Sequence, residues 1–180
     1  MVETTTIKVL EGDDLQEKID TAPEWAVLQL GGGSWERIMI RRKVSIIGDG
    51  SSRIAGITIS GSGSGDEGQV LLKNLIITGG EAKRGGGLEI DWPGGVVVED
   101  CSIIGNRAVH GGGIWAVDGD VVVEDCIFKN NRADQGSSIF LYGGVVRVEK
   151  CQFLGNEEEL AGGEIGGYDF DLRMRWCNMV

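Results

Sequence analysis

Cysteines recur at a constant interval in this chain, and their spacing is the first feature with chemical meaning. Cys101, Cys126 and Cys151 are 25 residues apart, and Cys177 follows after 26 more. Cysteines stacked on neighbouring coils of a repeat lie within disulfide range, so disulfides are one interpretation. The other is a column of buried free thiols that act as small hydrophobic side chains. We favour free thiols, because all four cysteines occupy one inward position, and no CxxC pair or histidine partner supports a metal site.

Acidic residues recur at the same interval, two positions before the cysteines. This acidic column comprises Glu99, Glu124 and Glu149, with Asp100 and Asp125 beside it. Stacked carboxylates could hold Ca²⁺, whose ligands are oxygens, or could form an acid–base pair. Lys73 and Arg175 flank the same column, so we favour a partly compensated, solvated surface and predict no metal site or cofactor.

Aromatic residues cluster near a third recurring position. The candidate aromatic face consists of Trp92, Trp115, Phe140, Tyr142 and Tyr168. Alternation along the predicted strand 113–117 and its copies turns these rings outward, with Trp92 at the adjoining turn. Clustered aromatics on a solvent face indicate a protein contact or stacking on sugars. The alternative is that residues 105–111 fold over the rings.

The chain presents no recognisable catalytic group. His110 is the only histidine, and no serine, cysteine or carboxylate stands at a spacing that would activate it. We therefore predict no catalytic residue and favour a chain that is not an enzyme.

The elements that carry these residues belong to an internal repeat. VVVEDCSIIGN (96–106), VVVEDCIFKNN (121–131) and VVRVEKCQFLGN (145–156) align, and a fixed period of this size is the mark of a solenoid. Each coil reads as three short strands whose inward apolar side chains stack on their copies. Asn106, Asn131 and Asn156 predict an inward ladder of amides at a corner. The fold class predicted is all-β, a parallel β-helix of about five to six coils.

The N-terminal segment reads as a cap on this stack. A strand over 4–10 precedes Asp14 and Glu17, which have the spacing of a capping box. Leu15, Ile19 and Ala22 lie on one side of the short helix that follows. We divide one domain, 1–180, into a cap (1–26), coils (27–168) and a partial last coil (169–180). The segment 61–68 is predicted to be a flexible loop.

The bulk composition limits the partners and the compartment. A net charge of −11 argues against nucleic acid or an anionic membrane as partner. The apolar runs are too short to span a bilayer. The start MVETTTIKVL shows no signal peptide, which favours a cytoplasmic or organellar protein, although a processed secreted form would look the same.

The repeats resemble a known group of sequences. Phe128–Asn131 with GSSI, and Phe153–Asn156 with GGEI, are similar to repeats of polymorphic outer-membrane proteins within the pectin-lyase-like superfamily. The opening resembles the capping helix and first coil of pectin-methylesterase-like chains. These resemblances imply a right-handed β-helix. The chain departs from the enzymes, because it lacks the NTD and RIK motifs of polygalacturonases, and from the outer-membrane proteins, because no membrane barrel follows.

These resemblances and departures leave two possible functions. The first is a scaffold or binding subunit that docks a protein partner, or itself, through an open C-terminal end and the aromatic face. The second is a small carbohydrate-active enzyme or glycan-binding module that recognises a polysaccharide.

Overall fold

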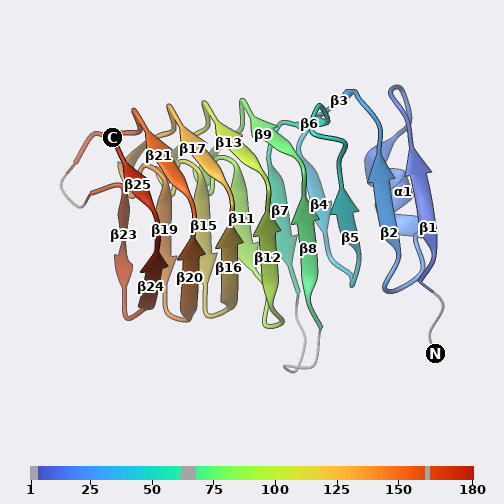
Figure 1. The fold of residues 1–180 in the computed structure, drawn as a ribbon. Helices are drawn as coiled ribbons and strands as arrows, with labels where there is room; N and C mark the ends of the chain where they lie inside the picture. The colour runs from blue at the N-terminus through green and yellow to red at the C-terminus, as the bar shows by residue number, and fades with distance from the viewer. Residues whose placement is uncertain (1–3, 62–67, 161–162) are drawn as a thin grey trace.

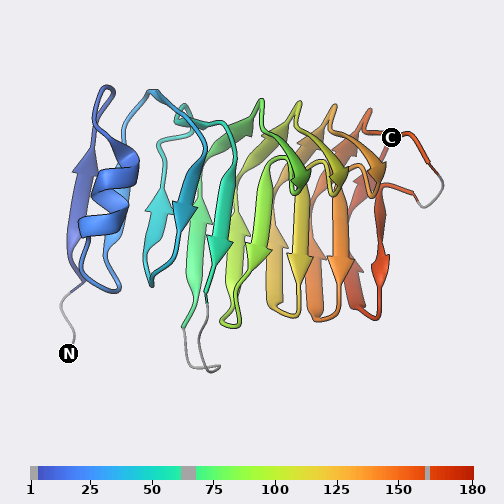
Figure 2. The same ribbon diagram turned by 180° about the vertical axis from the view of Figure 1, so that it is seen from behind.

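The chain winds into a stack of parallel β-strand coils, seen from two sides in Figures 1 and 2. The computed structural model describes residues 4–61, 68–160 and 163–180. Strands at equivalent positions of successive coils pair in parallel and build four sheets. Most of the predicted loop 61–68 lies outside the described residues.

Sheets A and B form two walls of the stack. Sheet A contains β1 (Thr6–Val9), β2 (Val27–Leu30), β5 (Ser45–Ile47), β8 (Val70–Lys73), β12 (Val96–Glu99), β16 (Asp120–Glu124), β20 (Val145–Glu149) and β24 (Asp171–Arg175). Sheet B contains β3 (Ser34–Trp35), β6 (Arg53–Ile54), β9 (Ile76–Thr78), β13 (Ser102–Ile104), β17 (Ile127–Lys129), β21 (Gln152–Leu154) and β25 (Asn178–Met179).

Sheet C is the third wall, and sheet D is a shorter addition between sheets B and C. Sheet C contains β4 (Ile38–Ile40), β7 (Ile57–Ser60), β11 (Leu88–Asp91), β15 (Ile114–Val117), β19 (Ile139–Tyr142) and β23 (Ile165–Tyr168). Sheet D contains β10 (Glu81–Arg84), β14 (Arg107–His110), β18 (Arg132–Gln135) and β22 (Glu157–Glu158).

The observed coils differ from the predicted ones in number and in content. The stack has about seven turns, because β1 pairs with β2 as a member of sheet A and β24 and β25 continue sheets A and B. The regular coils also have four strands where we expected three. The extra strand, such as β14, was not predicted because the short run RAVH does not alternate apolar and polar residues. In the structure, Ala108 is the buried residue of this run.

The core consists of the predicted inward columns. Val98, Val123 and Val148 stack in register in sheet A. In sheet B, the rings of Phe128 and Phe153 stack with centroids 4.9 Å apart. These side chains are fully buried, because each coil covers the apolar face of its neighbour.

Asparagine side chains join successive coils at one corner, as the sequence predicted. Asn106 donates through Nδ2 to Oδ1 of Asn131 at 3.1 Å, and Asn131 donates in the same way to Asn156 at 3.1 Å. The same Asn131 Nδ2 also donates to the carbonyl of Ile103 at 2.8 Å. The ladder therefore satisfies backbone groups that would be left unpaired at the turn.

The four cysteines are free, and three of them are buried in the core. The Cys126 thiol donates to the carbonyl of Val98 at 3.4 Å, and the backbone N–H of Cys101 donates to the Cys126 sulfur at 3.4 Å. Hydrogen bonding with the Cys101 thiol and burial raise the pKa of Cys126. Cys177, in the last coil, is only half-buried, although partial burial raises its pKa as well. The expected column of thiols is confirmed.

A short helix, α1 (Leu15–Thr21), lies at the N-terminal end of the stack (Figure 2). Asp14 caps it by accepting the Glu17 N–H at 2.9 Å, and Leu15 and Ile19 enter the core. The Gln16 side chain pairs with the edge of sheet C as a further strand would: it accepts from Met39 N–H at 2.8 Å and donates to the Met39 carbonyl at 3.0 Å. The helix thus closes one open sheet edge.

We expect Asn131→Ala to lower the free energy of unfolding by about 3 kcal/mol, because it leaves several buried polar groups without partners. Chemical denaturation measures this loss. Gln152→Ala, an exposed change in sheet B, is the control and should cost less than about 0.5 kcal/mol. Equal losses in the two variants would mean that the ladder does not stabilise the coils.

We expect a thiol reagent to label the folded chain at one rapid site, Cys177, and to label the other three thiols only as the chain unfolds. Time-resolved labelling with and without denaturant distinguishes the two classes. Cys177→Ser should remove the rapid phase, while Cys101→Ser should leave it unchanged. Rapid labelling of the Cys177→Ser variant would contradict a buried column.

Candidate functional site

A glycine turn folds sheet D back beside the outer face of sheet C. Gly111 joins β14 to β15 with a φ of +67°, and a Cβ added there would clash with the Ile114 carbonyl oxygen. Gly85 and Gly136 stand at the same place in the neighbouring coils, with φ of +55° and +61°. Only glycine tolerates both the positive φ and this close backbone approach. The turn places the ends of β10, β14 and β18 against outward side chains of sheet C.

The predicted exposure of Trp115 and Phe140 is therefore wrong. Both rings point away from the core cluster, yet they are only 7% and 6% exposed. The Arg84 guanidinium lies 4.5 Å from the centre of the Trp115 ring, and the His110 ring lies 5.0 Å from Phe140. The alternative that we kept open, residues 105–111 folding over the rings, is the correct one.

Trp92 is also misplaced by the sequence prediction. Its ring belongs to the buried core, and Nε1 donates to the carbonyl of Gly68 at 3.1 Å. The prediction failed because Trp92 lies at a turn, where alternation along a strand does not define which way a side chain points.

Two of the predicted aromatic residues do face solvent, and both lie near the C-terminal end of sheet C. Tyr142 and Tyr168 are 52% and 56% exposed and meet edge to face at 6.2 Å. The Tyr168 ring also meets Phe140 edge to face at 5.9 Å. The exposed tyrosine pair therefore rests on a covered ring and belongs to the last two strands of sheet C.

A groove of about 530 Å³ lies between sheets C and D. Its lining consists of Lys83, Arg84, Glu89, Val109 and His110. Within it Arg84 pairs with Glu89 at 3.1 Å, and Arg37 approaches the same carboxylate at 3.8 Å. His110 Nδ1 is buried and has no hydrogen-bond partner among the described residues. The groove is therefore lined by charged groups, and His110 Nδ1 is free to form a hydrogen bond with a ligand.

The sequence did not identify this groove. We considered His110 only as a catalytic group and did not include Arg37, Arg84 or Glu89 among the candidate residues. The feature that would reveal the groove is the strand register, because Arg84 and His110 are paired positions of neighbouring strands in sheet D. That register cannot be read without first recognising β10 and β14 as strands.

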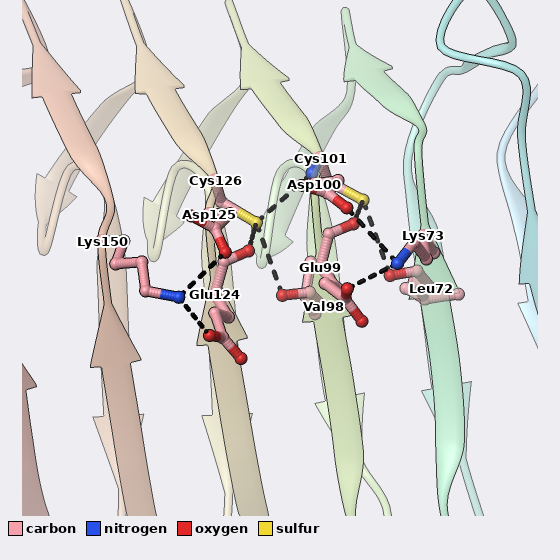
Figure 3. A network of polar contacts seen from close by, with 10 residues as sticks. All are labelled: Leu72, Lys73, Val98, Glu99, Asp100, Cys101, Glu124, Asp125, Cys126 and Lys150. Carbon is pink, nitrogen blue, oxygen red and sulfur yellow. Dashed lines mark hydrogen bonds and ion pairs between the residues drawn. The ribbon is translucent and has the colours of Figure 1, made fainter.

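The acidic column on the outer face of sheet A is held by lysines (Figure 3). Lys73 contacts Glu99 at 2.5 Å and Asp100 at 3.4 Å. Lys150, which follows β20, contacts Glu124 at 2.8 Å and Asp125 at 3.5 Å in the neighbouring coil. Hydrogen bonding to Glu99 raises the pKa of Lys73, and hydrogen bonding to Glu124 raises the pKa of Lys150.

The remaining carboxylate of the column, Glu149, stands in register with Arg175. Four of the five carboxylates are thus paired with a lysine, and Glu149 has an arginine at the paired strand position. Among residues 4–61, 68–160 and 163–180, no group of three or more histidine, cysteine or acidic residues is arranged to hold a metal ion. In the same residues, no helix is long and apolar enough to cross a membrane.

Comparison with known proteins identifies the architecture. A family model described as a right-handed β-helix region matches residues 40–172, which is most of the chain. No curated protein and no solved structure matches significantly.

We expect millimolar Ca²⁺ to leave the thermal unfolding midpoint unchanged, because the Lys73 and Lys150 ammonium groups already occupy the carboxylates. Lys150→Ala should lower the free energy of unfolding no more than an exposed lysine substitution outside the column does, since its ion pairs are exposed. Lys129→Ala, an exposed lysine of β17, is the matched control. A calcium-dependent rise in the midpoint of the unaltered chain would instead favour a calcium site at the acidic column.

Proposed function

Because the chain belongs to the family of right-handed β-helix proteins, we propose that it is a non-enzymatic β-helix scaffold that docks a protein partner or a second copy of itself. The docking surface comprises the last coil and the exposed tyrosine pair, Tyr142 and Tyr168. These parts are continuous, because Tyr168 ends β23 and the last coil (169–180) follows it directly.

The observation that carries this proposal is the incomplete burial of core positions in the last coil. Val146 and Val148 of β20 are fully buried, but their register partners in β24, Leu172 and Met174, are only half-buried. Neighbouring exposed apolar side chains enlarge the surface, and they are Tyr168, Trp176, Met179 and Val180. A partner that covers this surface gains apolar burial in the same way that one coil gains it from the next.

The edge strands give the same surface a polar component. Among the described residues, β24 pairs only with β20, and β23 pairs only with β19. Their free backbone groups can accept a further strand, which is how edge strands add partners. Apolar contact supplies affinity here, and the backbone pattern supplies orientation.

The test uses variants that keep the core intact. The full chain, immobilised, should retain a protein from the source organism's extract that the double variant Tyr142→Ser/Tyr168→Ser binds at least about tenfold less well. Leu10→Ser, an equally exposed apolar change in a loop after β1, is the matched control and should bind normally. Equal binding by all three proteins, measured with the purified partner, would contradict docking through this surface.

A glycan-binding module is the second candidate, and the groove between sheets C and D favours it. Val109 offers an apolar contact, and Arg84, Glu89 and the unpartnered His110 Nδ1 offer polar groups to a sugar. A panel of acidic and neutral polysaccharides, with and without calcium, tests it. Binding lost in His110→Ala but retained in Tyr142→Ser would support this candidate over the first. Absence of binding across the panel, with no unsaturated product, would reject it.

A further inference from the structure

We propose that the last coil binds the last coil of a second copy, with the two β24 strands antiparallel and a two-fold axis passing at Leu172. This inference rests on the proposed function, because it names the partner of the docking surface described above. Figure 1 shows β23, β24 and β25 together at the C-terminal end of the stack. The interface would be isologous, with the same residues contributed by each chain.

The charge sequence around β24 is self-complementary. Residues 169–175 read DFDLRMR, with two aspartates, an apolar centre and two arginines. Antiparallel pairing centred on Leu172 sets Asp171 opposite Arg173 of the second copy, and the symmetry makes this contact twice. Further out, Arg175 lies toward Asp169 of the second copy, which precedes β24. Opposite charges directly across antiparallel strands attract, and like charges repel.

Other registers lack this complementarity. Centring the pair on Arg173 would set two arginines directly opposite each other. A parallel, in-register arrangement would stack aspartate on aspartate and arginine on arginine. The Leu172-centred register is the one among these three in which each charged residue meets its opposite.

The side chains have the exposure that the register requires. Asp171 and Arg173 are exposed on the outer face of β24, where they already pair with each other at 2.8 Å. Leu172 and Met174 point the other way, toward the core. Alternation along both strands would therefore join the two outer faces through a four-charge cluster and the two cores through apolar side chains.

The overall charge also favours this end of the molecule. The chain carries −11, which opposes self-association elsewhere on its surface. Residues 165–180 contain two aspartates and two arginines, so their formal charges balance. The N-terminal segment 1–26 contains seven acidic residues and two lysines, and Gln16 already occupies the edge of β4 there. A closed pair of last coils therefore fits better than a head-to-tail filament.

Charge reversal in the full-length chain tests the register, with mass measured by sedimentation equilibrium over a range of concentrations. The unaltered chain should dimerise. Asp171→Arg and Arg173→Asp should each weaken dimerisation by roughly tenfold or more, because each creates two like-charge contacts. An equimolar mixture of the two variants should form a heterodimer, since both cross-strand contacts then join an arginine of one chain to an aspartate of the other. The doubly reversed variant Asp171→Arg/Arg173→Asp should dimerise with itself.

Asp120→Arg is the matched control, because Asp120 occupies the same column as Asp171 in a coil that is covered on both sides. It should dimerise normally, and circular dichroism should show all variants folded. A monomeric unaltered chain, or single variants that dimerise as it does, would overturn the inference. Polymers that grow with concentration would also overturn it, in favour of head-to-tail contact. A monomer that still binds a different protein through Tyr142 and Tyr168 would overturn this inference alone and leave the proposed function standing.

Discussion

Every coil of this protein depends on hydrogen bonds to the coils on either side. A strand such as β16 donates and accepts along both edges, to β12 and to β20, so its backbone has no partner within its own coil. Parallel pairing in register follows, and it brings equivalent side chains of successive coils together at roughly 4.8 Å. The asparagine ladder, the stacked Phe128 and Phe153 rings and the thiol column all result from that one spacing. None of them would form in an isolated coil.

The same dependence makes the two ends of the stack chemically different from its middle. At the N-terminal end, the Gln16 amide bonds both backbone groups of Met39, so a side chain takes the place of a missing strand. At the C-terminal end, β24 has one strand neighbour among the described residues and leaves Leu172 and Met174 half-buried. An end that is not covered retains both the unpaired backbone and the unburied apolar area, and these are the two contributions from which a protein interface is built.

The inward half of the fold was predictable from sequence, and much of the outward half was not. Inward residues such as Val98 and Val123 repeat with the coil, because each must match its neighbours above and below, so a period reveals them. The spacing of Asp14 and Glu17 likewise predicts the capping helix, because it forms a local capping motif. Outward residues face no such constraint. Trp115 was assigned correctly to the outward side, but its burial depends on sheet D, whose RAVH and RADQ strands carry almost no apolar alternation.

Sheet D also decides which outward residues remain available for binding. The turn at Gly111 places sheet D beside sheet C, so that Arg84 covers Trp115 and His110 covers Phe140. Tyr142 and Tyr168 stay exposed because they stand two residues further along β19 and β23, at the end away from the glycine turn. The aromatic residues therefore occupy two neighbouring outward columns, one covered by sheet D and one exposed to solvent.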